Sequence, residues 1–234
     1  MLPDGERAEP SPPGRRATRP ASAAHPQALV PPGREPGGFR RIGERERLQI
    51  GILKLVTGTF VGPDGFTFER EIVRHQGAVC IVPVEDDGHQ VVCVRQYRAP
   101  VDRFVLELPA GKRDVPGEPA AATAARELIE ETGFRATSLL EICSFLNSPG
   151  FSDEETICYL AEGLEAVERE AQGVEERHMS VGRLDLDQLF DLVATGEVVD
   201  AKTIVACAVV RNLLEERRRD AARDTDDAAA SDTL

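Results

Sequence analysis

The segment 111–134, GKRDVPGEPAAATAARELIEETGF, constrains this chain more than any other stretch. Its middle part, PAAATAARELIEE, is rich in strong helix formers. Pro119 suits the first position of a helix, because its missing N–H has no partner there in any case. Gly133 can adopt the left-handed conformation that ends a helix. The sequence therefore predicts a helix that begins near Pro119 and ends at Gly133.

This predicted helix carries three carboxylates on one face. Glu127 lies three residues before Glu130 and four before Glu131, spacings that bring side chains together on a helix. Like charges at these spacings repel by roughly 0.2–0.5 kcal/mol per pair. A divalent cation would neutralise them, and hard oxygen ligands favour Mg²⁺, with Mn²⁺ as the alternative. The pattern assigns a core-facing surface to Ala121, Ala125, Leu128 and Ile129.

Taken alone, these charges also fit a solvated acidic helix with Glu–Arg pairs. The complete pattern is more specific and resembles the Nudix box, Gly-x5-Glu-x7-Arg-Glu-U-x-Glu-Glu-x-Gly-U, in which U is a bulky apolar residue. The matching positions are Gly111, Glu118, Arg126, Glu127, Leu128, Glu130, Glu131, Gly133 and Phe134. Six residues instead of five separate Gly111 from Glu118, in a loop where insertions are tolerated. The resemblance implies an α/β fold of the Nudix type, an α/β/α sandwich with a mixed β-sheet.

Segments on both sides of the box resemble the ADP-ribose pyrophosphatase branch of the Nudix hydrolases. ELPAGK (107–112) precedes the box, SPGFSDE (148–154) follows it, and Pro149 stands sixteen residues after Gly133. The resemblance implies Mg²⁺-dependent hydrolysis of the pyrophosphate bond of ADP-ribose to AMP and ribose 5-phosphate. The alternatives are another nucleoside diphosphate sugar, either an ADP-sugar or GDP-mannose, and a non-catalytic ADP-ribose sensor. In this branch an N-terminal β segment is exchanged between subunits, which implies a homodimer.

The resemblance also assigns roles to the box residues. Glu127 and Glu131 are expected to ligate metal, together with the backbone carbonyl of Ala110. Glu130 is expected as an additional ligand. Arg126 is expected to orient these carboxylates through charge-assisted hydrogen bonds.

The general base is expected in a loop well after the box, as the resemblance implies. The corresponding segment is GVEERHM (173–179), in which Glu176 is the favoured base and Glu175 the alternative. His178 also has a suitable pKa range for a base. The competing interpretation is a solvated run of charges.

Substrate contacts are expected from two regions and comprise Arg70, Glu71, Arg98 and Glu107. Arginine suits bidentate phosphate binding, although surface salt bridges explain these residues equally well. Adenine needs an aromatic or apolar face, and the chain has no Trp, so Phe104 or another phenylalanine would supply it. Ser152 and Asp153 are expected either to reach the terminal ribose or to form a turn.

Composition narrows the class of protein. The net charge of −13 argues against nucleic-acid binding through a basic surface, and an anionic substrate then needs local cations. The five cysteines stand singly, without a zinc or disulfide pattern, which is typical of a cytoplasmic protein. No apolar run is long enough to span a membrane, and no signal peptide is recognisable.

Four regions are expected along the chain. Residues 1–40 form a Pro-, Gly- and Arg-rich disordered tail. Residues 41–78 form an N-terminal β segment for dimerisation, and residues 79–216 form the Nudix hydrolase domain with a last helix at 199–216. Residues 217–234 form a charged disordered tail.

Overall fold

The computed structural model of the protein describes residues 38–85, 88–171 and 173–231. The tail predicted at 1–40 lies outside the described residues up to position 37, and so do residues 232–234 at the other end.

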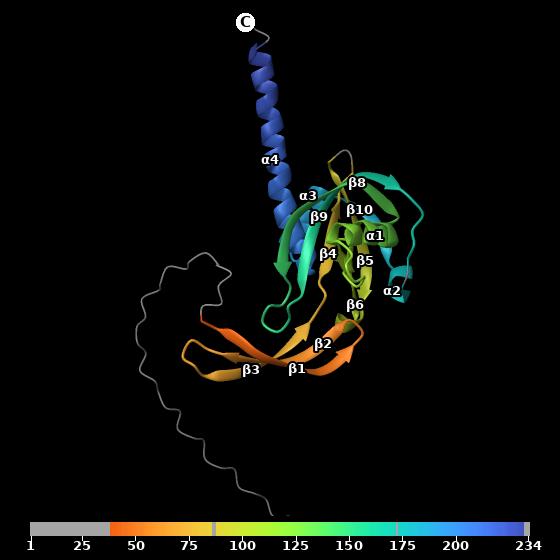
Figure 1. The fold of residues 1–234 in the computed structure, drawn as a ribbon. Coiled ribbons are helices and arrows are strands. Elements are labelled where there is room, and N and C mark those ends of the chain that lie inside the picture. The colour runs from red at the N-terminus through yellow and green to blue at the C-terminus, as the bar shows by residue number, and fades with distance from the viewer. Residues whose placement is uncertain (1–37, 86–87, 172, 232–234) are drawn as a thin grey trace, which may run out of the picture. The chain divides into compact units, whose positions relative to one another are not determined.

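An antiparallel sheet opens the described chain. It consists of β1 (Arg40–Ile50), β2 (Leu53–Val61) and β3 (Thr67–Arg74) in that order (Figure 1). The turn between β2 and β3 closes through a hydrogen bond from Gly65 N to Gly62 O, and Gly65 has a φ of 82° that favours glycine. The end of β3 is joined to the 148–153 loop, because Val73 N donates to Phe151 O at 2.8 Å.

Two further sheets form the rest of the strand framework. The four-stranded sheet has the order β7-β4-β9-β8, with β4 parallel to β9 and the other pairs antiparallel. Its strands are β4 (Ala78–Pro83), β7 (Ala110–Lys112), β8 (Phe134–Leu146) and β9 (Glu155–Ala166). The three-stranded antiparallel sheet has the order β10-β5-β6 and consists of β5 (Gln90–Arg98), β6 (Arg103–Glu107) and β10 (Ser180–Asp185).

Helices cover both faces of the β4–β9 pair (Figure 1). Successive side chains of a strand point to opposite faces. One face packs on α1 (Ala120–Thr132) through Val79, Ile81, Tyr159 and Ala161. The other packs on α3 (Leu186–Ala194) and α4 (Ala201–Ser231) through Cys80, Val82, Cys158 and Leu160. This arrangement confirms the predicted α/β/α sandwich with a mixed sheet.

The helix of the acidic segment has the predicted bounds but a different buried face. It ends at Gly133, which is left-handed with a φ of 74°. Ala121 and Ala125 are exposed, whereas Thr123 and Ala124 are buried. The prediction for the two alanines was wrong because the helix packs with its carboxylate-bearing side turned inward, where three glutamates are buried as well.

The C-terminal part differs from expectation in two places. α4 continues to Ser231, past the end at 216 that the sequence suggested, and 217–231 contains no Gly or Pro to stop it. β10 was not anticipated, because its residues merge into the start of α3. No helix in the described ranges is both long and apolar enough to cross a bilayer.

Candidate active site

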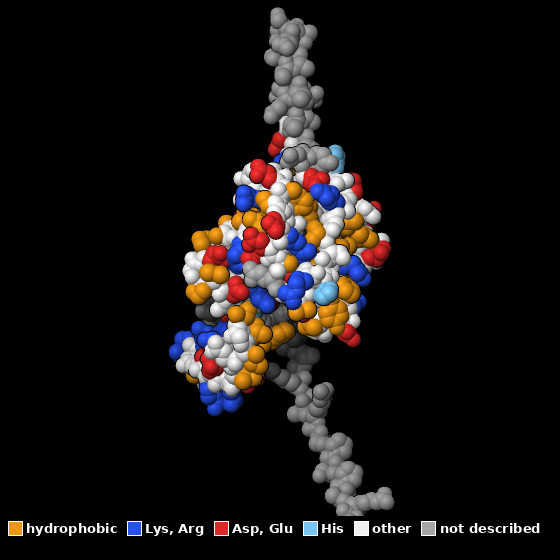
Figure 2. Space-filling view, turned by 90° about the vertical axis from the view of Figure 1, so that its right-hand side faces the viewer, with side chains coloured by type: hydrophobic (Ala, Val, Ile, Leu, Met, Phe, Trp, Pro, Cys, Tyr) orange, Lys and Arg blue, Asp and Glu red, His pale blue; other side chains and the backbone are white. Residues whose placement is uncertain are grey.

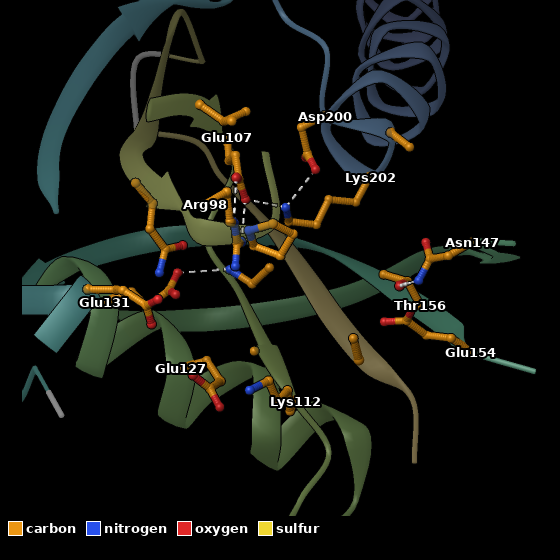
Figure 3. A pocket seen from close by; sticks show the side chains of 18 of the residues that line it. Arg98, Glu107, Lys112, Glu127, Glu131, Asn147, Glu154, Thr156, Asp200 and Lys202 are labelled. Carbon is orange, nitrogen blue, oxygen red and sulfur yellow. Dashed lines mark hydrogen bonds and ion pairs between the residues drawn. The ribbon is translucent and has the colours of Figure 1, made fainter. Parts of the chain in front are cut away.

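An acidic cavity of about 720 Å³ opens between α1, the β5–β6 strands, α2 (Val174–Arg177) and the start of α4. Five Lys or Arg residues line it, against nine carboxylates: Glu107, Asp114, Glu127, Glu130, Glu131, Glu154, Glu175, Glu176 and Asp200. Figure 3 shows side chains from α1, the β5–β6 strands and the start of α4 around one space. The excess of carboxylates would repel an anionic ligand unless cations offset their charge.

Arg126 holds the carboxylates of α1 together. Its Nη1 donates to Glu127 Oε1 at 2.9 Å and to Glu130 Oε2 at 3.1 Å, and its Nη2 donates to Glu118 Oε2 at 3.3 Å. Burial opposes the charge on Arg126, but the bond to Glu118 and the charges of Glu127 and Glu130 outweigh it and raise its pKa. Arg126 thus contacts three carboxylates of the box, and its expected role in orienting them stays a prediction.

Glu131 is the most enclosed carboxylate of α1, with 5% of its surface exposed. Burial raises the pKa of Glu131 to about 8, against a lowering effect of the hydrogen bond from the Ala110 backbone N–H. Burial likewise raises the pKa of Glu127 to about 7, and the nearby charge of Glu130 adds to this effect. Negative charge on this helix face is thus poorly compensated by the protein itself.

Gly111 lets α1 approach β7. A Cβ at position 111 would overlap the carboxyl group of Glu127, so a side chain here would displace that group or the strand. Ala110, the predicted carbonyl ligand, lines the same cavity, and its N–H donates to Glu131 Oε2 at 2.9 Å. The close approach of Glu127 therefore explains why the first position of the box is a glycine.

Glu107 and Arg98 form one wall of the cavity, and Lys202 joins them. Glu107 is 2% exposed, and its two oxygens accept from Arg98 Nε at 2.7 Å and Nη2 at 2.5 Å, and from Lys202 Nζ. Burial opposes ionisation of Glu107, but the hydrogen bond from Arg98 and the charge of Lys202 lower its pKa. With both oxygens engaged, Glu107 positions the two cations.

Lys202 was missed by the sequence analysis. It lies in the first turn of α4, where a positive charge is unfavourable, and Asp200 offsets this by accepting from its Nζ at 2.8 Å. Asp200 also accepts from the backbone N–H of Thr203 at 3.0 Å and so caps the helix. The run Asp-Ala-Lys-Thr at 200–203 contains this cap, which was a usable signal in the sequence.

The predicted contacts on β3 do not reach the cavity of their own chain. Arg70 lies 4.8 Å from the ring centre of Phe68 and donates to Glu69 O, and Glu71 accepts from Thr57 Oγ1 at 3.0 Å. Neither Arg70 nor Glu71 lines the cavity. Their assignment stays a prediction that requires a second copy of the chain.

The remaining predicted substrate residues, Phe104, Ser152 and Asp153, do not line the cavity themselves. Phe104 is half-exposed, packs edge-on against Tyr97 and lies under Arg95, and its neighbours in β6 line the cavity. Asp153 accepts from the backbone N–H of His75 at 2.9 Å, and Ser152 accepts from Glu154 N at 3.1 Å. The 148–154 loop thus forms a turn, and Glu154 is its member that lines the cavity together with Ser148.

Both candidate bases lie on α2 and line the cavity. Glu175 and Glu176 stand in its first turn, and Gly173 precedes them. The structure therefore brings the acidic loop and the carboxylates of α1 to one space, although Val174 follows the end of α1 at Gly133 by 41 positions.

Comparison with known proteins decides the family. A profile of the NUDIX domain matches residues 74–207, more than half of the chain. The chain belongs to the Nudix family. This confirms the family assignment made from the box.

Several known proteins are similar to this chain over most of their length. The ADP-ribose pyrophosphatase of Bacillus subtilis (strain 168) is 42% identical, over 62% of this chain and 77% of that protein. The ADP-ribose pyrophosphatase of Mycobacterium tuberculosis is 41% identical, over 63% and 71%. The methanol dehydrogenase activator of Bacillus methanolicus is 37% identical, over 66% and 83%. A solved ADP compounds hydrolase has the same fold, with a TM-score of 0.68 at 23% identity over 76% of this chain and 95% of that one.

The donor set on α1 fits a divalent ion, the cofactor on which Nudix hydrolases depend in general. Glu127, Glu130 and Glu131 offer the hard oxygen ligands that such ions prefer. The raised pKa values of Glu127 and Glu131 show that burial disfavours their ionised forms, which a bound cation would stabilise. Among the described residues, no group of three or more Asp, Glu, His or Cys side chains has the geometry of a metal site. Arg126 supplies the positive charge near Glu127 and Glu130.

Proposed function

We propose that this Nudix protein hydrolyses the pyrophosphate bond of ADP-ribose to AMP and ribose 5-phosphate, with Mg²⁺ as the metal. The observation that carries the proposal is the convergence of the α1 carboxylates and the α2 glutamates on one acidic cavity. The two ADP-ribose pyrophosphatases at 41–42% identity support the choice of substrate. The cavity volume suits a ligand of nucleotide-sugar size.

Glu127 and Glu131 would hold Mg²⁺, with Glu130 and the Ala110 carbonyl as further ligands. Bound at these residues, a divalent ion supplies positive charge for the diphosphate and lowers the pKa of a water molecule. Arg126 keeps the carboxylates oriented through its hydrogen bonds to Glu127 and Glu130.

Glu176 is the proposed general base, with Glu175 as the alternative. The base accepts a proton from the attacking water, whose oxygen forms a bond to one phosphorus. The bond from that phosphorus to the bridging oxygen breaks, and the other phosphate leaves with that oxygen. The position of both glutamates on the cavity lining supports this role.

Arg98 and Lys202 are proposed to contact the diphosphate from the opposite wall. The carboxylate of Glu107 fixes both cations, and Arg98 Nη1 is not used by that pair. Arginine presents a planar fork of donors that matches phosphate oxygens.

A second copy of the chain is proposed to complete the site through the β1–β3 sheet. β1 is exposed along its length, and exposed apolar side chains on this sheet include Ile42, Leu48, Ile50, Leu53 and Leu55. Such a patch indicates an interaction surface. The segment 40–74 has seven Lys or Arg against five acidic residues, and Figure 2 shows the basic side chains on this lower lobe. Its charge complements an acidic cavity and would bring Arg70 and Glu71 to the partner's site.

The proposed compartment is the cytoplasm. All five cysteines, Cys80, Cys93, Cys143, Cys158 and Cys207, are free thiols. Free thiols in this number fit a reducing environment.

Steady-state hydrolysis over a panel of nucleotide sugars tests the substrate. We expect kcat/KM for ADP-ribose to exceed the values for ADP-glucose and GDP-mannose by at least about tenfold, a difference of roughly 1.4 kcal/mol. If the protein prefers GDP-mannose, the proposed substrate is wrong, but the proposed pyrophosphate hydrolysis stands. Binding of ADP-ribose without AMP release at saturating Mg²⁺ would identify a sensor.

Light scattering in the same buffer tests whether the protein is a dimer. A molar mass equal to that of a monomer would overturn the proposal that two chains share the site.

A further inference from the structure

Arg169 connects the segment of the candidate base to the helix of the candidate metal ligands. It lies just after β9 and donates from Nη2 to Glu176 O at 2.7 Å and from Nη1 to Met179 O at 3.5 Å. Its Nε donates to Glu130 O at 3.4 Å. One side chain therefore connects α1 to Glu176 itself and to Met179 at the end of the segment 173–179.

All three acceptors are backbone carbonyls, and Arg169 forms no ion pair with the residues that the structure describes. Glu130 O lies near the C-terminal end of α1, where carbonyls carry partial negative charge. A planar guanidinium with donors on three nitrogens can satisfy acceptors on two elements at once, which an ammonium group does less well.

The surrounding backbone holds Arg169 close to α1. Val167 N donates to Gly133 O at 2.8 Å. A Cβ at Gly133 would lie 3.3 Å from the Cβ of Arg169 and 3.2 Å from Val167 O, so glycine permits this approach. At the far end of the turn, Met179 is buried and anchors the chain where β10 begins. The span between these two anchors is bridged by the Arg169 side chain.

We propose that Arg169 is a positioning residue that fixes Glu175 and Glu176 relative to the carboxylates of α1. This proposal rests on the hydrolytic function proposed above, because the geometry matters for catalysis only if α2 carries the base. Arg169 does not line the cavity, so it acts on the reaction through the backbone of the 173–179 segment.

The first test is hydrogen exchange of the wild-type protein and of Arg169→Ala, without substrate. We expect faster exchange confined to 173–179 in the variant, with α1 and the sheets unchanged. The matched control is Arg211→Ala, since Arg211 is exposed and its contacts, an ion pair with Glu215 and a cation–π contact with Phe190, lie outside 173–179. Equal protection of 173–179 in Arg169→Ala and wild type would overturn the proposal, whether or not the protein hydrolyses ADP-ribose.

The second test is kinetic. Arg169→Ala should lower kcat by about 100-fold, the scale of a misplacement of roughly 1 Å, while KM and the Mg²⁺ concentration for half-maximal rate stay within about twofold. Added guanidinium at non-denaturing concentration should restore roughly a tenth or more of the rate, and Arg169→Lys should retain intermediate activity. An unchanged kcat, or a loss without rescue in a variant that remains folded, would contradict the positioning role. A wild-type protein that fails to cleave ADP-ribose refutes the proposed function separately.

Discussion

The carboxylate of Glu131 accepts a hydrogen bond from the backbone N–H of Ala110, 2.9 Å away, and so joins α1 to β7. This bond holds Glu131, a candidate metal ligand, beside the backbone of Ala110, whose carbonyl is another candidate ligand. Because it satisfies only one oxygen with a neutral donor, Glu131 remains a buried carboxylate with a pKa near 8, raised mainly by burial. A fold that retains such a group is consistent with a cation as its missing partner.

Gly111→Ala tests the close approach of α1 and β7. The new Cβ would overlap the Glu127 carboxyl group, so we expect kcat to fall by about 100-fold or more. Gly182→Ala is the matched control, because a Cβ there meets nothing within 4 Å. Initial-rate measurements at saturating Mg²⁺ compare the two variants, and equal rates would show that the steric argument is mistaken.

Stability without metal should decline as the pH rises. Burial places the folded-state pKa of Glu127 at about 7 and that of Glu131 at about 8, above the 4.5 of the unfolded chain. Ionisation therefore opposes folding: the effect is absent below pH 4.5, grows above it, and is complete beyond about pH 8. Each unit of raised pKa corresponds to about 1.4 kcal/mol, so the two increases, about 2.5 and 3.5 units, set an upper bound of roughly 8 kcal/mol on the loss in the free energy of unfolding.

Mg²⁺ should reverse this loss. Its ligands must be deprotonated, so the rise in Tm on adding Mg²⁺ should be larger at about pH 8 than at about pH 6. Calorimetry with and without chelator measures both values. The double variant Glu127→Gln/Glu131→Gln should show neither the pH dependence nor the Mg²⁺ effect, and an equal Mg²⁺ shift in that variant would refute the ligand assignment.

Lys202→Met tests the ion network on the opposite wall. It leaves buried Glu107 with Arg98 alone, and we expect a loss of about 2–4 kcal/mol in the free energy of unfolding. Lys54→Met is the control, because Lys54 is half-exposed and lies 4.0 Å from Glu46, where pairs contribute less than about 1 kcal/mol. Denaturant titration that finds both variants equally stable would contradict a structural role for Lys202.

The sequence predicted the site better where its signals were local. Pro119 and Gly133 set the bounds of α1, and the spacing of Glu127, Glu130 and Glu131 placed them on one side of it. The buried face of the helix was not predictable from apolarity, because the cavity takes up the carboxylate side and leaves Ala121 and Ala125 exposed.

Pairings between residues far apart in the chain could not be predicted from the sequence. Lys202 meets Glu107 from 95 positions away, and Arg169 reaches Glu130 from 39 positions away, so neither has a neighbour in the chain that reveals its partner. Glu107 was expected to contact the substrate. Only the structure shows that both of its carboxylate oxygens already accept hydrogen bonds, from Arg98 and Lys202.

The most direct test is the release of AMP and ribose 5-phosphate from ADP-ribose by wild-type protein and by Glu131→Gln, each with Mg²⁺ and with chelator. We predict equimolar products from the wild type with Mg²⁺, none above background with chelator, and a kcat at least about 1000-fold lower in the variant, the scale of losing a group that stabilises charge in the transition state. Glu131→Gln that cleaves ADP-ribose at the wild-type rate, or wild-type cleavage that persists in chelator, would contradict the metal-centred account.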